Sequence, residues 1–133
     1  MAGTGTPGNT GDGGLPTSAR LLFPYGIAVD SLGNIFSVDT YNHAIRMIST
    51  STGIITTVAG TVGTFGYSGD GGLATSATLF YPGCVAVDTS GNIYIADSNN
   101  DVIQIVRKSN GIITTIAGTG MSGYSGDGGL ATA

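Results

Sequence analysis

One phrase occurs three times in this chain of 133 residues. The string GYSGDGGLAT occupies residues 66–75 and recurs unchanged at residues 123–132, and a divergent copy, GNTGDGGLPT, occupies residues 8–17. The sequence between the copies repeats as well, because residues 11–60 align with residues 69–118 at a shift of 58 and 27 of the 50 positions are identical. A period of this length excludes a short β-helix repeat and predicts two successive copies of one structural unit.

Each unit contains four short segments rich in Val, Ile, Thr and Tyr, which predicts strands separated by turns of Gly, Asn and Asp. Gly33 and Gly91 suit hairpin turns that require positive φ. Some of these segments are apolar on both faces, which predicts sheets packed between two others, as in a β-propeller. The expected strands are residues 26–30, 34–39, 44–49 and 54–60, and then 84–88, 92–97, 102–107 and 112–118.

The predicted fold class is therefore all-β, with two four-stranded antiparallel propeller blades at residues 26–60 and 84–118. Loops that lead into a blade are expected at residues 1–25 and 61–83, and a partial third loop copy at residues 119–133. Two blades cannot close a ring, and large uncovered apolar faces usually mark an interface. We expect head-to-tail self-association that ring closure brings to a stop. Three chains and six blades are favoured over four chains and eight blades.

Three segments carry a family resemblance. PYGIAVD at 24–30, DTSGNIYIAD at 88–97 and NHAIR at 42–46 resemble the signature of NHL-repeat β-propellers. The second unit departs from that signature at Asp101 and Gln104, where the first has His43 and Arg46. The resemblance implies a binding scaffold more often than an enzyme, and commonly six blades. Some NHL-type propellers are lyases whose metal is held by several histidines, and this sequence has one histidine.

Charge is scarce in this chain and its balance is acidic. Four Lys and Arg against eight Asp give a net charge of −4, which argues against a nucleic-acid partner and against a polybasic membrane anchor. No apolar run reaches the length that a membrane span needs. The single Cys84 excludes an intrachain disulfide and leaves the cellular compartment open.

Antiparallel strands reverse direction at each turn. The loops between blades and the turns after the second strands are therefore expected on one face of the propeller. That face is expected to receive a polar ligand, a cation or a segment of a protein or peptide partner. The candidate binding residues are Asp12, Asp70, Asp127, Tyr41, Asn42, His43, Asn99, Asn100 and Asp101. Arg107 and Lys108 lie at the third turn and are expected near the opposite face.

The repeated SGDGG string has three interpretations. The favoured one is an Asp-capped glycine turn that bonds its own backbone, followed by a helical turn that docks Leu73, Ala77 and Leu79 onto the rim. The others are a calcium site and direct contact with a ligand. Calcium takes six to eight oxygen ligands, so one Asp per loop suffices only where neighbouring loops converge. We therefore expect no cofactor, with calcium as the alternative.

No catalytic cluster is evident in the sequence. Hydrolytic triads and zinc sites need more His or Cys than this chain has. His43 is expected to be either a solvated turn histidine or a residue that packs at a blade edge. Cys84 is expected to be a small buried hydrophobic residue, and Arg46 to pair with Asp39. The leading hypothesis is a non-catalytic module that binds a protein or peptide and assembles with itself. The alternatives are a calcium-dependent ligand- or carbohydrate-binding propeller and an enzyme with its site at the central channel.

Overall fold

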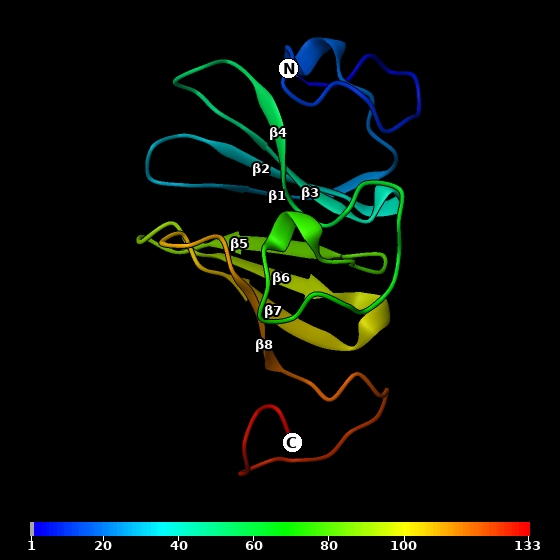
Figure 1. Cartoon of the computed structure of the whole chain (residues 1–133), viewed down its shortest axis with the longest axis vertical. Helices are drawn as coiled ribbons and strands as arrows, with labels where there is room; N and C mark the ends of the chain where they lie inside the picture. Colours follow the sequence, from blue (N-terminus) through cyan, green and yellow to red (C-terminus); the bar gives the residue numbers. More distant parts are fainter. Residues whose placement is uncertain (1) are drawn as a thin grey trace.

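A computed structural model describes residues 2–133 and contains two antiparallel four-stranded sheets, each with its strands in sequence order. The sheets stack on each other, as Figure 1 shows. Blade 1 consists of β1 (Pro24–Val29), β2 (Ile35–Asp39), β3 (Ala44–Ile48) and β4 (Ile55–Ala59). Blade 2 consists of β5 (Cys84–Val87), β6 (Ile93–Asp97), β7 (Val102–Val106) and β8 (Ile113–Ala117). The predicted all-β class and the two four-stranded sheets are confirmed.

The strand boundaries follow the turn chemistry of the sequence. β1 begins at Pro24, two residues before the expected start, and the other strands lie within the expected ranges. The carboxylate of Asp30 closes the first hairpin, because its Oδ1 accepts hydrogen bonds from the backbone N–H groups of Leu32 at 2.9 Å and Asn34 at 2.8 Å. Asp88 makes the equivalent bonds to Ser90 and Asn92 in blade 2. Both aspartates therefore shape turns.

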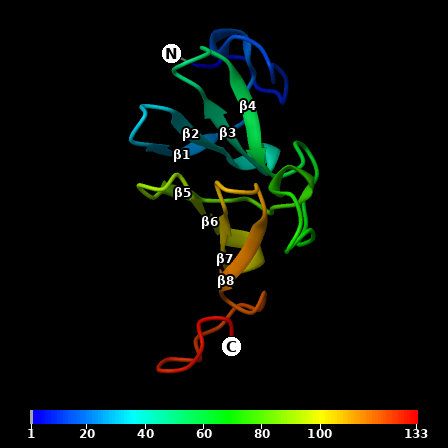
Figure 2. The same cartoon turned by 60° about the vertical axis from the view of Figure 1, so that its left-hand side comes forward.

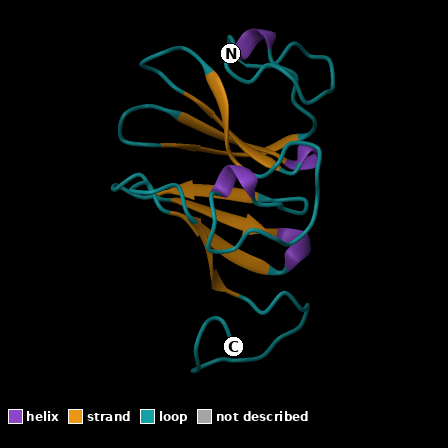
Figure 3. Ribbon diagram, in the orientation of Figure 1, coloured by secondary structure: helices purple, strands orange, loops and turns teal. Residues whose placement is uncertain are grey.

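Four short 3₁₀ helices decorate the sheets, two in loops and two after second strands (Figure 3). None of the helices in residues 2–133 is long and apolar enough to cross a membrane. The helices are η1 (Pro16–Ser18), η2 (Thr40–Asn42), η3 (Ala74–Ser76) and η4 (Ser98–Asn100). η2 and η4 lie at one end of their blades, the end that we call the loop face.

The hydrophobic core lies between the two sheets. Val38 and Ile45 of blade 1 and Val85 and Ile95 of blade 2 are each at most 4% exposed and belong to one packed cluster. The loop between the blades adds Ala74, Ala77 and Leu79 to this cluster. The expectation that Leu73 docks with them is wrong, because its side chain is 55% exposed and its backbone instead bridges Ile112.

The outward faces of the two blades are uncovered. Ile27 of β1 is 69% exposed, whereas Val85, the residue at the same position of blade 2, is 4% exposed because blade 1 covers it. Figure 2 shows that the two sheets fan apart from the side on which β1 and β5 are neighbours. Blade 1 therefore presents the kind of face that blade 2 buries.

Cys84 is exposed, so the expectation that it is buried is wrong. Its counterpart in blade 1 is Gly26, which faces blade 2 closely: a Cβ there would meet Val38 at 3.0 Å and the backbone of Cys84 at 3.4 Å. Blade 2 has Ala96 in the place of Val38, directly across from Cys84 in the β5–β6 pair, and this smaller side chain leaves room for the thiol. Cys84 lies on the face of blade 2 that turns away from blade 1.

The loop copies run along the outer strands. Gly13 donates its N–H to the Ile55 carbonyl at 2.8 Å, and Gly14 accepts the Ile55 N–H at 3.0 Å, so the first copy (residues 8–17) pairs with β4. The second copy (residues 66–75) pairs with Ile113 of β8 in the same way, through Gly71 and Gly72. The third copy (residues 123–132) extends away from both sheets, at the bottom of Figure 1.

Candidate functional site

Six aromatic rings gather on the loop face where the two blades meet. The shortest separations between ring centroids are 4.6 Å for His43 and Tyr81, 4.7 Å for Phe23 and Tyr41, and 4.9 Å for Tyr41 and Tyr81. Phe65 stacks on Phe80 at 5.1 Å and also approaches His43. We call this set the aromatic patch. Its members are Phe23, Tyr41, His43, Phe65, Phe80 and Tyr81.

Much of the patch is open to solvent. Phe23 is 67% exposed, Phe65 63% and Tyr41 48%. Exposed aromatic side chains offer large contact area at a small entropy cost, and Tyr adds a polar hydroxyl group, which is why such residues are enriched in binding surfaces. The patch is therefore a surface suited to an apolar or aromatic group of a partner.

The backbone holds two of these rings in a strained conformation. Phe23 and Tyr81 have φ of 51° and 47°, in the left-handed region that bulky residues rarely adopt. Each precedes a proline, and Tyr81 is fixed by its N–H, which donates to Nδ1 of His43 at 3.1 Å. Such strain persists only where surrounding contacts impose it and is concentrated at functional sites. The two aromatic side chains are thereby held beside η2.

His43 is a structural member of the patch. It is 5% exposed, and burial lowers the pKa of its imidazole, which stays neutral and accepts the Tyr81 N–H. It adopts φ of 57° at the end of η2 and begins the turn into β3. The side chain therefore joins the turn of blade 1 to the entrance of blade 2.

Asn42 and Asn100 lie below the surface of the loop face. Nδ2 of Asn42 donates to the Gly8 carbonyl at 2.7 Å and to the Asp39 carboxylate at 2.9 Å. Nδ2 of Asn100 makes the same pair of bonds, to the Gly66 carbonyl and Asp97. Because the two asparagines are 4% and 8% exposed, they hold the loop copies in place from inside.

Two buried carboxylates support these asparagines. Asp39 accepts the Leu22 N–H at 2.7 Å and pairs with Arg46 at 3.2 Å, as expected; burial raises the pKa of its carboxyl. Asp97 accepts the Phe80 N–H at 2.7 Å, and burial raises its pKa to about 6. Gln104 occupies the position of Arg46 in blade 2. Among the described residues, Asp97 therefore has hydrogen-bond partners but lacks the ion pair that Asp39 makes with Arg46.

The aspartates of the repeated phrase do not gather on the loop face. Asp12 accepts the Thr57 N–H at 3.0 Å and pairs with Arg46 at 2.6 Å, and Asp70 accepts the Thr115 N–H at 2.6 Å. Both therefore lie at the outer edge of a blade, bonded to its fourth strand. The alternation of strand direction predicted where the loops begin and end. It could not predict that their middle parts, which contain Asp12 and Asp70, run back along the fourth strands.

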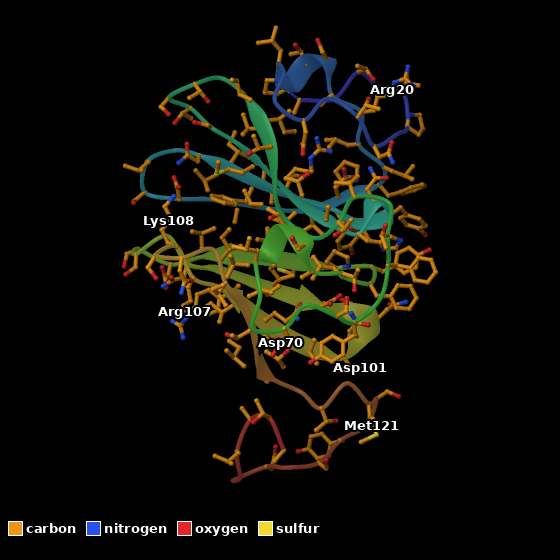
Figure 4. The ribbon with its side chains drawn as sticks, in the orientation of Figure 1. Arg20, Asp70, Asp101, Arg107, Lys108 and Met121 are labelled. Atoms are coloured by element: carbon orange, nitrogen blue, oxygen red, sulfur yellow. The ribbon has the colours of Figure 1, made fainter. Side chains whose placement is uncertain are left out.

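The remaining candidate residues are exposed but separate. Asn99 and Asp101 belong to the η4 turn of blade 2, and Figure 4 places Asp101 on the loop face and Asp70 away from it. Asp127 accepts a hydrogen bond from the hydroxyl of Tyr124 at 2.7 Å in the third copy. In residues 2–133, no three His, Cys, Asp or Glu side chains cluster closely enough to hold a metal ion together.

Sequence reasoning identified Tyr41 and His43 but missed Phe23, Phe65, Phe80 and Tyr81. A signal for Phe23, Phe80 and Tyr81 was present in the strings LLFPYG and LFYPGC, where an aromatic residue precedes a proline at the same position of both units, whereas Phe65 lies in neither string. The proline disfavours the helical conformation of the preceding residue. That the rings of four separate segments converge is a property of the fold alone.

A second concavity lies between the blades near their first and third turns. It encloses about 510 Å³ and is lined by apolar residues such as Phe36, Met47 and Ile93 together with Arg107 and Lys108. The two cations thus lie at the end opposite the aromatic patch, as Figure 4 shows. The aromatic patch therefore lies at one end of the molecule, and a mixed group of charges, Asp30 and Asp88 with Arg107 and Lys108, lies at the other.

The strand order and these motifs agree with the sequence comparison. The family model of the teneurin NHL domain matches residues 4–68 and, a second time, residues 63–125. The chain belongs to the NHL-repeat family. The two NHL matches together span almost the whole chain and confirm the resemblance carried by the three signature segments.

The relatives of this NHL chain are much longer proteins. It is 31% identical over 98 residues to the chloroplastic protein SUPPRESSOR OF QUENCHING 1 of Arabidopsis thaliana, covering 74% of this chain and 9% of that protein. It is 34% identical over 95 residues to NHL repeat-containing protein 2 of Bos taurus, covering 70% and 13%. The NHL chain thus spans about a tenth of the length of these relatives.

Solved structures confirm the fold of the two NHL units. A structural genomics protein of unknown function from Bacteroides thetaiotaomicron VPI-5482 superposes with a TM-score of 0.65 at 31% identity, over 72% of this chain and 24% of that one. Virginiamycin B lyase from Staphylococcus aureus superposes with a TM-score of 0.52 at 18% identity, over 86% and 29%. The second likeness concerns the fold alone. Both show that the two sheets have a propeller-type arrangement.

Proposed function

We propose that this chain is a non-catalytic NHL propeller module that assembles head to tail into a closed ring and serves as a scaffold for a protein or peptide partner. The proposed assembly is supported chiefly by the difference in exposure between Ile27 and Val85. These residues occupy the same position in the two blades, and one is 69% exposed while the other is 4% exposed. Burying one such side chain contributes about 1.5–3 kcal/mol.

The two open faces are complementary because they are the two halves of the junction already present in the chain. Blade 1 presents Ile27 and Val29, the counterparts of Val85 and Val87. Blade 2 presents Tyr94, Ala96 and Ile103, the counterparts of Phe36, Val38 and Ile45. A head-to-tail contact between copies repeats the internal junction and leads to a ring, with six blades from three chains as the favoured assembly.

Sedimentation velocity at micromolar concentration tests the assembly. We expect the wild-type chain to sediment as a discrete oligomer and the Ile27→Asp variant as a monomer, because the new carboxylate would be buried at the junction. Leu15→Asp is the matched control, since Leu15 is 63% exposed but lies on the rim. A wild-type chain that stays at the monomer mass of 13.2 kDa would refute the proposal.

The aromatic patch supports the scaffold role. His43 and Asn42 are engaged in structural hydrogen bonds, whereas Phe23, Tyr41 and Phe65 turn exposed ring surface to solvent. Selection from a displayed random peptide library should give binders enriched in apolar residues. Their binding should be lost in Phe65→Ser and kept in Leu32→Ser, which removes an exposed side chain at the opposite end. Equal binding to both variants would exclude the patch.

A further inference from the structure

The third loop copy duplicates the first in length as well as in sequence. Residues 117–133 align with residues 2–18 at a shift of 115 without a gap, and 11 of the 17 positions are identical. All three copies also close on themselves in the same way: the N–H groups of Gly3, Gly60 and Gly118 donate to the carbonyls of Pro16, Ala74 and Ala131 at 2.8–2.9 Å. The third copy is therefore folded as a loop of this type but lies against no blade.

The slot that such a copy occupies is defined by the two that are docked. It consists of the start of the fourth strand, which pairs with the Gly-Gly of the loop, and of a threonine on that strand, which donates its N–H to the loop aspartate. In blade 2, Oγ1 of Thr115 donates to Oδ1 of Asp70 at 2.9 Å, and the hydroxyl of Tyr67 makes a second hydrogen bond of 2.8 Å to the same oxygen of Thr115. The second copy thus satisfies both polar groups of the threonine.

The first copy satisfies its slot less well. Its residue at the position of Tyr67 is Asn9, and Oγ1 of Thr57, the counterpart of Thr115, is buried without a hydrogen-bond partner among residues 2–133. A buried hydroxyl group without a partner is unfavourable. The third copy carries Tyr124 at this position, and its side chain is 89% exposed. The third copy therefore holds the group that the slot of blade 1 lacks.

We propose that in the assembled ring the third loop copy of each chain docks on blade 1 of a second copy of the chain and displaces that copy's residues 2–18. Asp127 takes the place of Asp12 beside Arg46 and Thr57, and the hydroxyl of Tyr124 binds Oγ1 of Thr57. This inference rests on the proposed head-to-tail assembly and names the segment that fastens it.

Geometry favours the exchange once the ring has formed. The third copy follows β8 directly, just as the second copy follows β4 and docks on the next blade. It therefore crosses the junction between chains while remaining attached to blade 2. Both competing copies are then tethered beside the same slot at comparable effective concentrations, so their contacts decide which one binds. The Tyr124 hydroxyl favours the third copy by about fivefold, the equivalent of one ordinary hydrogen bond.

Photo-crosslinking in the full chain tests this docking. Tyr124 is replaced by p-benzoylphenylalanine in a mixture of ¹⁵N-labelled and unlabelled chains, and crosslinked peptides are identified by mass spectrometry. We expect crosslinks from position 124 to residues 55–59 that join a labelled peptide to an unlabelled one. The same replacement of Tyr67 is the control and should give crosslinks to residues 113–117 within single chains, because Tyr67 contacts Thr115.

The result separates the two proposals. A chain that sediments as an oligomer but crosslinks from position 124 only within itself, or not at all while the Tyr67 control works, overturns the loop exchange and leaves the ring intact. A chain that stays monomeric overturns both. As a second measurement, the crosslinking residue is placed at Leu130, the counterpart of Leu73, which bridges Ile112 of blade 2, so that Tyr124 keeps its hydroxyl group. Asn9→Tyr then gives the first copy its missing hydroxyl group and should lower the yield of the interchain crosslink by about fivefold. An unchanged yield contradicts the role of Tyr124.

Discussion

Single residues distinguish the two blades, whose backbones are otherwise alike. Arg46 is 1% exposed and lies between the carboxylates of Asp39 and Asp12, at 3.2 Å and 2.6 Å. Gln104 takes this position in blade 2, and its Oε1 is buried without a partner in the described part of the chain. Blade 1 is therefore closed by an ion-pair network that joins strand to loop, and blade 2 is closed by hydrogen bonds to the carboxylates of Asp70 and Asp97.

Exchanging these two residues should shift stability in opposite directions. We expect Gln104→Arg to raise the free energy of unfolding at pH 7 by about 1 kcal/mol, because the guanidinium can donate to Asp97 and Asp70. Arg46→Gln should lower it by about 3 kcal/mol, because it leaves Asp39 buried without its cation. Urea denaturation of the two variants measures both changes. Equal changes of the same sign would contradict the role assigned to Arg46.

The pH dependence of stability should report Asp97. Its pKa is raised to about 6 in the folded chain, so the folded state binds a proton more tightly than the unfolded state. This contribution to the free energy of unfolding is present at pH 4 and is lost as the pH rises through 6. The pKa of His43 is lowered, so His43 reduces the free energy of unfolding as the pH falls below the ordinary pKa of histidine. This effect has the opposite sign to that of Asp97. Because both proteins contain His43, its contribution cancels in the difference in free energy of unfolding between wild type and Gln104→Arg.

Accordingly, the stabilisation by Gln104→Arg should grow between pH 4 and pH 6, because the new cation favours the ionised carboxyl. Thermal denaturation at half-unit pH steps measures it. A stabilisation that is constant over this range would show that Asp97 has the same protonation in both proteins.

At the scale of elements, the loop copies act as an edge to each sheet. They cover part of β4 and β8, which otherwise would present unpaired backbone groups to solvent. The close approach requires glycine: a Cβ at Gly69 would lie 2.7 Å from Cα of Ala77, whereas a Cβ at Gly71 would meet nothing within 4 Å. Both residues have positive φ, at 87° and 80°. The loop thus contains one glycine needed for space and another needed for conformation only.

This pair offers a matched test of loop packing. We expect Gly71→Ala to cost about 1 kcal/mol of stability, the strain of a left-handed residue. Gly69→Ala should cost at least about 2 kcal/mol, because the same strain is joined by a clash with backbone atoms. Urea denaturation measures both variants. Equal costs would mean that the loop moves away from Ala77 without penalty.

Elements were predictable from the sequence to the extent that their causes are local. The strands follow from β-branched residues between Asn, Asp and Gly turns, and no observed boundary differs from the expected one by more than two residues. The docking of Asp70 on Thr115, 45 residues along the chain, has no local cause, so the alternation of strand direction misplaced it. Cys84 was misjudged for a related reason, because the burial of a propeller strand depends on the next blade.

At the scale of the whole molecule, the exposed thiol reports on the open face of blade 2. By the repeat, Cys84 occupies the position of Gly26, which lies against the first strand of the following blade. In the proposed ring it would lie against blade 1 of the next copy. Cys84 should therefore react with a thiol reagent at least tenfold more slowly in the assembled wild type than in the Ile27→Asp variant.

The control for this measurement is the chain unfolded in urea, in which both proteins should react at one rate. Equal rates in the folded proteins, with sedimentation showing that only the wild type is assembled, would mean that Cys84 stays in contact with water in the ring.

The Gly26–Val38 pair of blade 1 and the Cys84–Ala96 pair of blade 2 occupy equivalent positions. In the first pair the second strand supplies the larger side chain, and in the second pair the first strand does. Within the chain, a bare backbone faces a branched side chain; at the outer face of blade 2, a thiol faces a methyl group. Any ring built from this chain would thus alternate between two kinds of seam around its circumference. Residues 61–83 join the two blades of one chain covalently, so only the seams between chains can dissociate and leave each pair of blades together.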